Sequence, residues 1–242
     1  MEKTADLLDL ALIAHGGLDR WKQLRQVKLH LSTDGYLWSV KGHEGLLRDQ
    51  HMLVYLHKQA SVQEKIFPEG LRSAFEPKRA SLSTRDGKLV EELANPRETF
   101  KGLKWEDHWS RLQVVFFSTY ATYTYFTTPF NLTIPGVTTK EIEPWAEAGE
   151  IWRRLEVSFP DSFMTHNKRQ VFYFDENGLL KRHDYWAETL GGAGAAHYVF
   201  DYREFDGIKM PTRHTIYQLQ DNNNYVPEPL LVRMKIMNVQ FE

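Results

Sequence analysis

From Val27 onward, and again after Pro135-Gly136, apolar and polar residues alternate along short segments that are separated by turn residues. A period of two places successive side chains on opposite faces of an extended strand. Short strands that follow one another without helices between them pair as an antiparallel sheet. We therefore expect a mainly β, α+β fold. The expected strands are VKLHLST, GYLWSVKG, HMLVYLHK, SVQEKIFP, RASLSTRDG, KLVEELA, TTKEIEPW, IWRRLEVSFP, RQVFYFD, LLKRHDYWAE, AHYVFDYREFDG, KMPTRHTIYQL and LLVRMKIMNVQFE.

The segment between Trp105 and Thr128 interrupts this pattern because it contains few turn residues. Its β-branched and aromatic content favours a strand, but a strand of more than about 20 residues is improbable. Its apolar residues also follow a helical stripe. We predict a helix over residues 107–125 that ends before Pro129, and we expect it to be buried because it is apolar on most sides.

The N-terminal residues 4–15 have apolar positions at helical spacing, with Thr4 as the expected N-cap and Gly16-Gly17 as the stop. A second short helix is expected over Leu18–Leu24, with Trp21 facing the core. The first apolar run is broken by acidic residues, so it does not have the form of a signal peptide. No stretch approaches the roughly 20 apolar residues of a membrane span. We therefore expect a cytoplasmic protein without stable membrane insertion.

The composition excludes several classes of function. The chain has no cysteine, which rules out disulfides, thiolate metal sites and a cysteine nucleophile. Its formal net charge of −2 gives no pull toward nucleic acid, and the short basic stretches KRHDY and EPKRA are expected to be solvated strand faces. A β-rich chain of 242 residues is expected to form a single domain, 1–242. The sequence carries no signal for an oligomeric state.

The order of these segments resembles the LolA/LolB-like superfamily of lipoprotein carriers and their soluble bacterial relatives. The stretches FDENGLLKRHDY at Phe174–Tyr185 and DGIKMPT at Asp206–Thr212 carry the likeness, which covers most of the chain by order of elements. The resemblance implies an incomplete antiparallel β-barrel wrapped around a long central helix, with an apolar cavity for acyl chains. LolA carriers have an export signal and LolB is anchored through an N-terminal lipidated cysteine, and we expect neither feature in this chain.

Aromatic residues make up 13% of the chain, more than a tightly packed core usually needs. Ligand sites are mostly apolar with a few placed polar groups. The alternative is that the rings fill a large core. The residues expected to line a cavity are Trp38, Tyr55, Phe116, Tyr120, Tyr123, Phe172, Phe174, Tyr185 and Tyr198.

Histidine-based chemistry is a second hypothesis, with His183, His197 or His166 as general base. A histidine beside a carboxylate is the usual base because its pKa lies close to working pH. His183 and Asp184 are adjacent, so on a strand they point to opposite faces. If Gly191–Gly194 is the centre of the following loop, His183 lies opposite Tyr202, and a slip of one residue places it opposite Asp201. The alternative for each histidine is a structural or surface role.

Two arginines are candidates for fixing an acidic head group. In IWRRLEVSF one arginine points inward unless a bulge intervenes, and an inward arginine needs a carboxylate partner from the protein or a ligand. Arg154 and Arg213 are these candidates. The chain has no HExxH motif, no histidines at i, i+4 and no His-x-His, so we predict no metal site. It also has no glycine-rich phosphate loop and no G-x-S-x-G elbow, so we predict no cofactor.

The sequence therefore favours binding of a small hydrophobic or amphiphilic molecule, of acyl-chain or polycyclic type, in an aromatic-lined half-barrel. One alternative is a cofactor-independent enzyme that acts on such a ligand through a histidine base. A second is a structural or interaction protein with a filled core.

Overall fold

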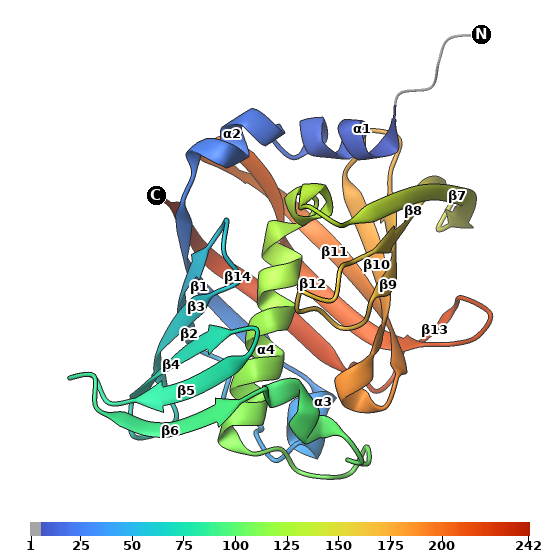
Figure 1. Ribbon diagram of the computed structural model, residues 1–242. Helices are drawn as coiled ribbons and strands as arrows, with labels where there is room; N and C mark the ends of the chain where they lie inside the picture. Colours follow the sequence, from blue (N-terminus) through green and yellow to red (C-terminus); the bar gives the residue numbers. More distant parts are fainter. Residues whose placement is uncertain (1–5) are drawn as a thin grey trace, which may run out of the picture.

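The structure is a computed structural model that describes residues 6–242 (Figure 1). Within this range, fourteen strands form one open sheet in which all paired strands are antiparallel. The main path has the order β6-β5-β4-β3-β2-β1-β14-β12-β11-β10-β9-β8-β7, and β13 pairs with β12. The sheet is thus an incomplete barrel, as predicted. Its strands are β1 (Gln26–Asp34), β2 (Gln50–Tyr55), β3 (Ser61–Ile66), β4 (Leu71–Glu76), β5 (Arg79–Ser83), β6 (Leu89–Ala94), β7 (Thr138–Glu147), β8 (Glu150–Ser158), β9 (Arg169–Phe174), β10 (Leu180–Ala187), β11 (Ala193–Phe205), β12 (Ile208–Leu219), β13 (Tyr225–Val226) and β14 (Val232–Phe241).

The long helix α4 (Arg111–Thr127) runs through the middle of the curved sheet (Figure 1). The prediction of a central buried helix is confirmed, although the helix begins later than residue 107. It begins there because Ser110 and Gln113 form a capping box, in which each side chain accepts a hydrogen bond from the other residue's backbone N–H. Apart from Arg111 and Tyr125, every residue of α4 is buried.

Two short helices, α1 (Leu7–Ala14) and α2 (Leu18–Gln23), lie across one end of the half-barrel (Figure 1). The N-cap of α1 is Asp6, whose side chain accepts hydrogen bonds from two backbone N–H groups of the first turn. The expected cap, Thr4, lies outside the described residues. Trp21 of α2 is buried, as predicted. Residues 6–242 also contain three 3-10 helices: η1 (Pro96–Phe100), η2 (Phe130–Thr133) and η3 (Glu188–Leu190).

Two local predictions for the first half of the sheet are wrong. The alternation in GYLWSVKG predicts a strand, but Tyr36–Val40 form the helix α3. Five residues are too few to separate the two periodicities, and the chain turns at Gly35, where a Cβ would lie 2.4 Å from the carbonyl oxygen of Leu231. Strand β4 was not predicted because its inward-facing Ser73 interrupts the apolar alternation.

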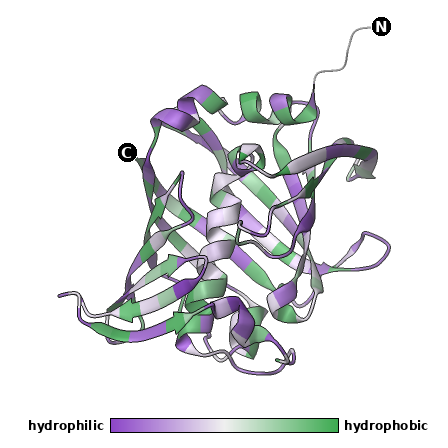
Figure 2. Ribbon diagram, in the orientation of Figure 1, coloured by the Kyte–Doolittle hydropathy of each residue, from purple (hydrophilic) through white to green (hydrophobic). Residues whose placement is uncertain are grey.

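The interior of the half-barrel is stratified into two apolar clusters with polar side chains between them. On β11, for example, Val199 belongs to one cluster, Ala195 to the other, and the buried His197 lies between them. The helix follows the same division, since α4 is strongly hydrophobic at its N-terminal end and paler in its middle and C-terminal turns (Figure 2). A third apolar cluster, which includes Trp152 and Tyr173, lies outside these two.

The register between β10 and β11 differs from both predicted alternatives. His183 is paired with His197, not with Tyr202 or Asp201. The connection is centred nearer Leu190, because η3 forms part of the turn and β11 already begins at Ala193. The prediction that His183 and Asp184 point to opposite faces holds, since their side chains bond to entirely different partners.

Candidate functional site

A groove of about 900 Å³ lies between α2 and the C-terminal end of α4, and we call it the α2–α4 groove. Segments far apart in the sequence form it: α2, the turn after β2, the turn after β4, the end of α4, η2 and the loop between β8 and β9. This volume falls in the range of ligand pockets. The main apolar residues of its wall are Trp21, Leu56, Tyr123, Phe130, Ile134 and Phe163.

The aromatic wall of the groove is held rigidly. Trp21 stacks on Phe130 with ring centroids 4.3 Å apart and nearly parallel planes. Tyr123 packs against Phe163 at 6.2 Å, and its hydroxyl donates a hydrogen bond to the carbonyl oxygen of Leu56 at 3.3 Å. These contacts hold the rings in one arrangement, and preorganised side chains of this kind lower the entropic cost of binding wherever they form a ligand site.

The rim of the groove is basic. Lys22, Lys58 and Lys78 line it, together with one carboxylate, Glu76. Glu76 is engaged by Lys58, at 2.6 Å. Among residues 6–242, Lys22 and Lys78 have no carboxylate partner, and both are exposed. The rim therefore attracts anionic groups.

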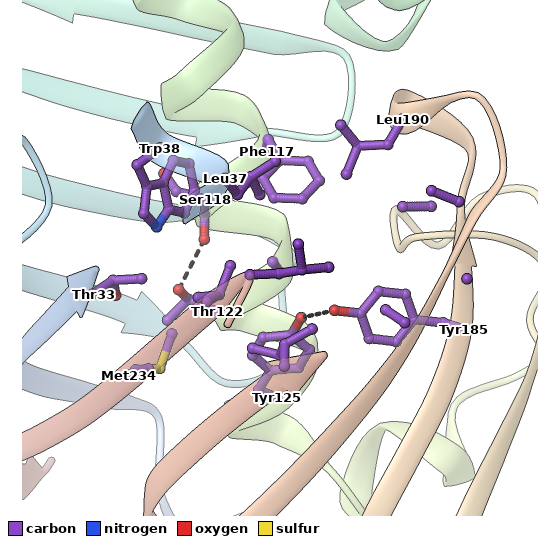
Figure 3. Close-up of a pocket in the computed structure, with 18 of the residues that line it drawn as sticks. Thr33, Leu37, Trp38, Phe117, Ser118, Thr122, Tyr125, Tyr185, Leu190 and Met234 are labelled. Atoms are coloured by element: carbon purple, nitrogen blue, oxygen red, sulfur yellow. Dashed lines mark hydrogen bonds between the residues drawn. The ribbon is translucent and has the colours of Figure 1, made fainter. Parts of the chain in front are cut away.

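An inner cavity lies between α3, α4 and strands β10, β11, β12 and β14 (Figure 3). Its wall is mostly apolar, with Trp38 and Phe117 near one end and Tyr125 and Tyr185 near the other (Figure 3). The cavity is small, about 40 Å³, which is enough for ordered water but not for a chain of methylene groups. Tyr125 keeps some accessible surface because it borders this space.

Behind Tyr125 and Tyr185 lies a buried group that we call the His–Tyr layer. The two hydroxyl groups are hydrogen-bonded to each other at 2.6 Å. Tyr125 also packs against His197, with ring centroids 4.2 Å apart and planes tilted by 53°. Strand register brings three of the histidines to the same inner face, and the fourth comes from the loop between β8 and β9. The members of the layer are Tyr125, His166, His183, Tyr185, His197 and His214.

Within the described residues, the four histidines of the His–Tyr layer form no hydrogen bond with a carboxylate. His183 Nε2 lies 2.6 Å from Oε1 of Gln170, and His197 Nε2 lies 2.8 Å from Nδ1 of His214. His166 Nε2 lies 3.0 Å from the Tyr125 hydroxyl. The second ring nitrogens of His166, His197 and His214 are buried without a hydrogen-bond partner in the described structure. They can therefore bond to water or to another polar group.

Burial makes these imidazoles weak bases. It lowers the pKa of His183 to about 3 and that of His214 to about 4. Burial also lowers the pKa of His166 and His197 well below the ordinary value, and neighbouring histidines add to the effect. At neutral pH the four rings are uncharged hydrogen-bonding groups. A general base works best with a pKa near the operating pH, so this layer is better suited to polar contacts than to proton abstraction.

The structure distributes the sequence-predicted aromatic residues over several environments. Tyr123 lines the α2–α4 groove, while Trp38 and Tyr185 line the inner cavity. Tyr55 is more than one-third exposed and borders a shallow hollow at the sheet surface. Tyr198 lies in the outer apolar cluster. The remaining four are fully buried in packed core and line none of these spaces: Phe116, Tyr120, Phe172 and Phe174.

The predicted charged residues lie away from the interior. Arg154 packs over the rings of Trp145 and Tyr173 on the outer face, and its Nε donates to the carbonyl oxygen of Glu143. Arg213 and Asp201 form an exposed ion pair at 2.7 Å, so Asp201 does not orient a histidine. Neither arginine reaches the groove or the inner cavity.

The sequence did not reveal the buried ion pair on the outer face of the sheet. KRHDY was expected to be a solvated strand face, but the side chains of Arg182 and Asp184 are 0% and 1% exposed. The guanidinium and carboxylate form two hydrogen bonds, at 2.7 and 2.9 Å. Glu147 and the backbone of Asn223 also bond to Arg182. The β7–β8 hairpin and the segment before β13 therefore cover this face.

This architecture is similar to that of several solved structures. A LolA superfamily protein from Nitrosomonas europaea aligns over 93% of this chain and 91% of its own, with a TM-score of 0.52 and 8% sequence identity. The chain has a LolA-like fold. A DUF1329 family protein from Desulfovibrio piger aligns over 98% of this chain and 92% of its own, with a TM-score of 0.48 and 11% identity. The predicted resemblance is confirmed at the level of the fold.

The sequence itself gives no closer match, since no family model and no curated protein matches the chain significantly. Within the described residues, no helix has both the length and the hydrophobicity needed to cross a membrane.

Proposed function

We propose that this protein binds an amphiphilic molecule whose apolar part lies in the α2–α4 groove. The observation that carries the proposal is the 900 Å³ groove with a preformed aromatic wall. Burying apolar ligand surface there contributes about 25 cal/mol per Å². The LolA-like fold supports the same class of ligand, because the resemblance implies a cavity for acyl chains.

The basic rim selects the head group. Lys22 and Lys78 have no carboxylate partner within the described chain, so an anionic head group finds two free ammonium groups there. The inner cavity offers no such charge, since its lining contains no lysine, arginine or histidine. The preferred ligand is therefore an amphiphile with an acidic head group, whose acyl chain lies along Tyr123 and Phe163.

The test compares two fluorescent probes of equal chain length, a polyene fatty acid and the corresponding polyene alcohol. We expect the wild type to bind both and to prefer the acid at low salt, since exposed charges are screened at high ionic strength. Ser162 is exposed and lines the groove. Ser162→Trp should therefore fill the groove and lower the affinity for both probes. The matched control is Glu176→Trp, at an exposed turn residue outside the groove.

Charge reversal tests the head-group assignment separately. Lys22→Glu and Lys78→Glu should each lower the affinity for the fatty acid by about threefold to tenfold at low salt. The affinity for the alcohol should stay unchanged. Lys88→Glu, in the turn between β5 and β6, is the matched control. The proposal fails if the wild type binds neither probe, or if Ser162→Trp binds both as tightly as the wild type does.

A further inference from the structure

A second cluster of polar side chains lies on the outer face of the sheet, away from the groove and the inner cavity. His30 of β1 and His51 of β2 are directly opposite each other in the antiparallel register. Their rings stack with centroids 4.3 Å apart and planes 10° from parallel. Asp49, one residue before β2, reaches both rings: its Oδ1 lies 2.8 Å from His30 Nε2 and 3.5 Å from His51 Nε2.

The register of the sheet, rather than a flexible loop, holds the two imidazoles together. Leu29 and Leu31 face the buried core, so the alternation along β1 turns His30 outward. On β2, Gln50 and Met52 are buried, so His51 between them also faces outward. Directly opposed residues on neighbouring strands have Cβ atoms only about 4.5–5.5 Å apart. The two nitrogen donors are therefore preorganised before any ion binds.

We propose that His30, Asp49 and His51 bind one divalent transition-metal ion of the zinc class. The ligand atoms of the three side chains all lie within 4.8 Å of one another. Imidazole nitrogen and carboxylate oxygen bind Zn²⁺ at about 2.0–2.2 Å, so small side-chain rotations bring all three into range. Two histidines and one carboxylate form a recognised three-ligand set that leaves a position for water.

The cluster is open to solvent. The three side chains are 34%, 76% and 49% exposed, in the order His30, Asp49 and His51, so an ion and its water have access. Charges of both signs lie nearby: Arg72 engages Glu64, which is opposite His51 on β3, at 2.9 Å, and Lys65 interacts electrostatically with Asp49.

This proposal departs from the expectation of no metal site, which rested on spacing along the sequence. The histidines are far apart in the chain and become neighbours only through strand pairing. A search for HExxH or His-x-His motifs does not detect such a cross-strand pair.

Isothermal titration of metal-free protein with ZnCl₂, in a buffer that does not chelate zinc, tests the proposal. We expect one equivalent to bind with micromolar affinity and to bind more weakly at acidic pH, since the ligands must be deprotonated. His51→Ala and Asp49→Asn should each weaken binding by about tenfold or more, and the double change His30→Ala with His51→Ala should abolish it. His108→Ala, at an exposed histidine outside the cluster, should bind as the wild type does.

Electron paramagnetic resonance of the protein with one equivalent of Cu²⁺ gives an independent readout. The wild-type spectrum should show coupling to two imidazole nitrogens, and the His51→Ala spectrum should lose one of them. Circular dichroism confirms that each variant is folded. The proposal is overturned if the double variant binds zinc like the wild type, or if the copper spectrum is unchanged in His51→Ala. Either outcome is independent of amphiphile binding in the α2–α4 groove.

Discussion

The side chain of Gln59 forms two hydrogen bonds with the backbone of Met164, donating one at 2.8 Å and accepting the other at 2.7 Å. Gln59 lies in the turn between β2 and β3, whereas Met164 lies in the loop between β8 and β9. These strands belong to opposite halves of the open sheet. The pair therefore joins the two halves across the open side of the half-barrel, beside the groove that Gln59 lines.

Replacement of Gln59 should loosen this closure. Gln59→Ala leaves the N–H and C=O of Met164 without their partner, so we expect a loss of about 1–2 kcal/mol in the free energy of unfolding. Amide hydrogen exchange should accelerate in residues 159–168, and a bound amphiphile should dissociate faster. Mass spectrometry after exchange and stopped-flow fluorescence measure the two effects. The exposed residue Gln220 provides the control. Equal amide exchange rates in this loop for Gln59→Ala and Gln220→Ala would show that Gln59 does not hold the two halves together.

His183 tests whether the buried histidines are structural. Its ring stacks on Phe172 with centroids 4.1 Å apart and bonds to Gln170. His183→Ala removes both contacts, so we expect the free energy of unfolding to fall by about 1–3 kcal/mol. His108→Ala, on the surface, should change it by less than about 0.5 kcal/mol. Urea denaturation measures both, and an unchanged midpoint for His183→Ala would exclude a structural role.

The buried histidines should make the fold sensitive to acid. Burial lowers the pKa of His15 and His214 to about 4 and that of His183 to about 3, from an ordinary value of 6.5. Between these values the unfolded chain binds more protons than the folded chain, so stability is highest above pH 6.5 and falls as the pH drops. Each histidine that stays neutral in the folded state should lower the free energy of unfolding by about 2 kcal/mol between pH 7 and pH 5.

Urea titrations at pH 7.5, 6 and 5 measure this dependence. His214→Gln removes one titrating group and should give a shallower pH profile than the wild type. A profile that is flat from pH 7.5 to 5 would show that the buried rings do not resist protonation.

The sequence predicted those features that depend on local periodicity. Alternation identified most strands, and the long run without turn residues identified α4. It failed where a short segment fits both periods, as in Tyr36–Val40, and where an inward polar residue such as Ser73 breaks the pattern. In both places tertiary contacts decide the local structure.

The candidate sites depend on relationships that no single segment contains. The α2–α4 groove is assembled from six separate segments. The register that pairs His183 with His197 depends on the short 3-10 turn at Glu188–Leu190, and a different centre for that turn gives different partners. Alternation also shows which face a residue takes, but not whether another hairpin covers that face. For this reason Arg182 was expected in solvent.

The ion pair between Arg182 and Asp184 supports the last prediction. Arg182→Met leaves the Asp184 carboxylate buried without its cation, so we expect a loss of about 3–5 kcal/mol in the free energy of unfolding. The double change Arg182→Met with Asp184→Leu removes both charges of the buried pair and should recover part of that loss, since apolar groups of similar volume often replace a buried pair without penalty. The recovery is incomplete because Glu147, which also bonds to Arg182, loses this partner. The exposed pair Arg213–Asp201 is the matched control, and Arg213→Met should cost at most about 1 kcal/mol. A double-mutant cycle by urea denaturation measures the coupling, and a double variant no more stable than Arg182→Met would show that the pair is needed for more than mutual neutralisation.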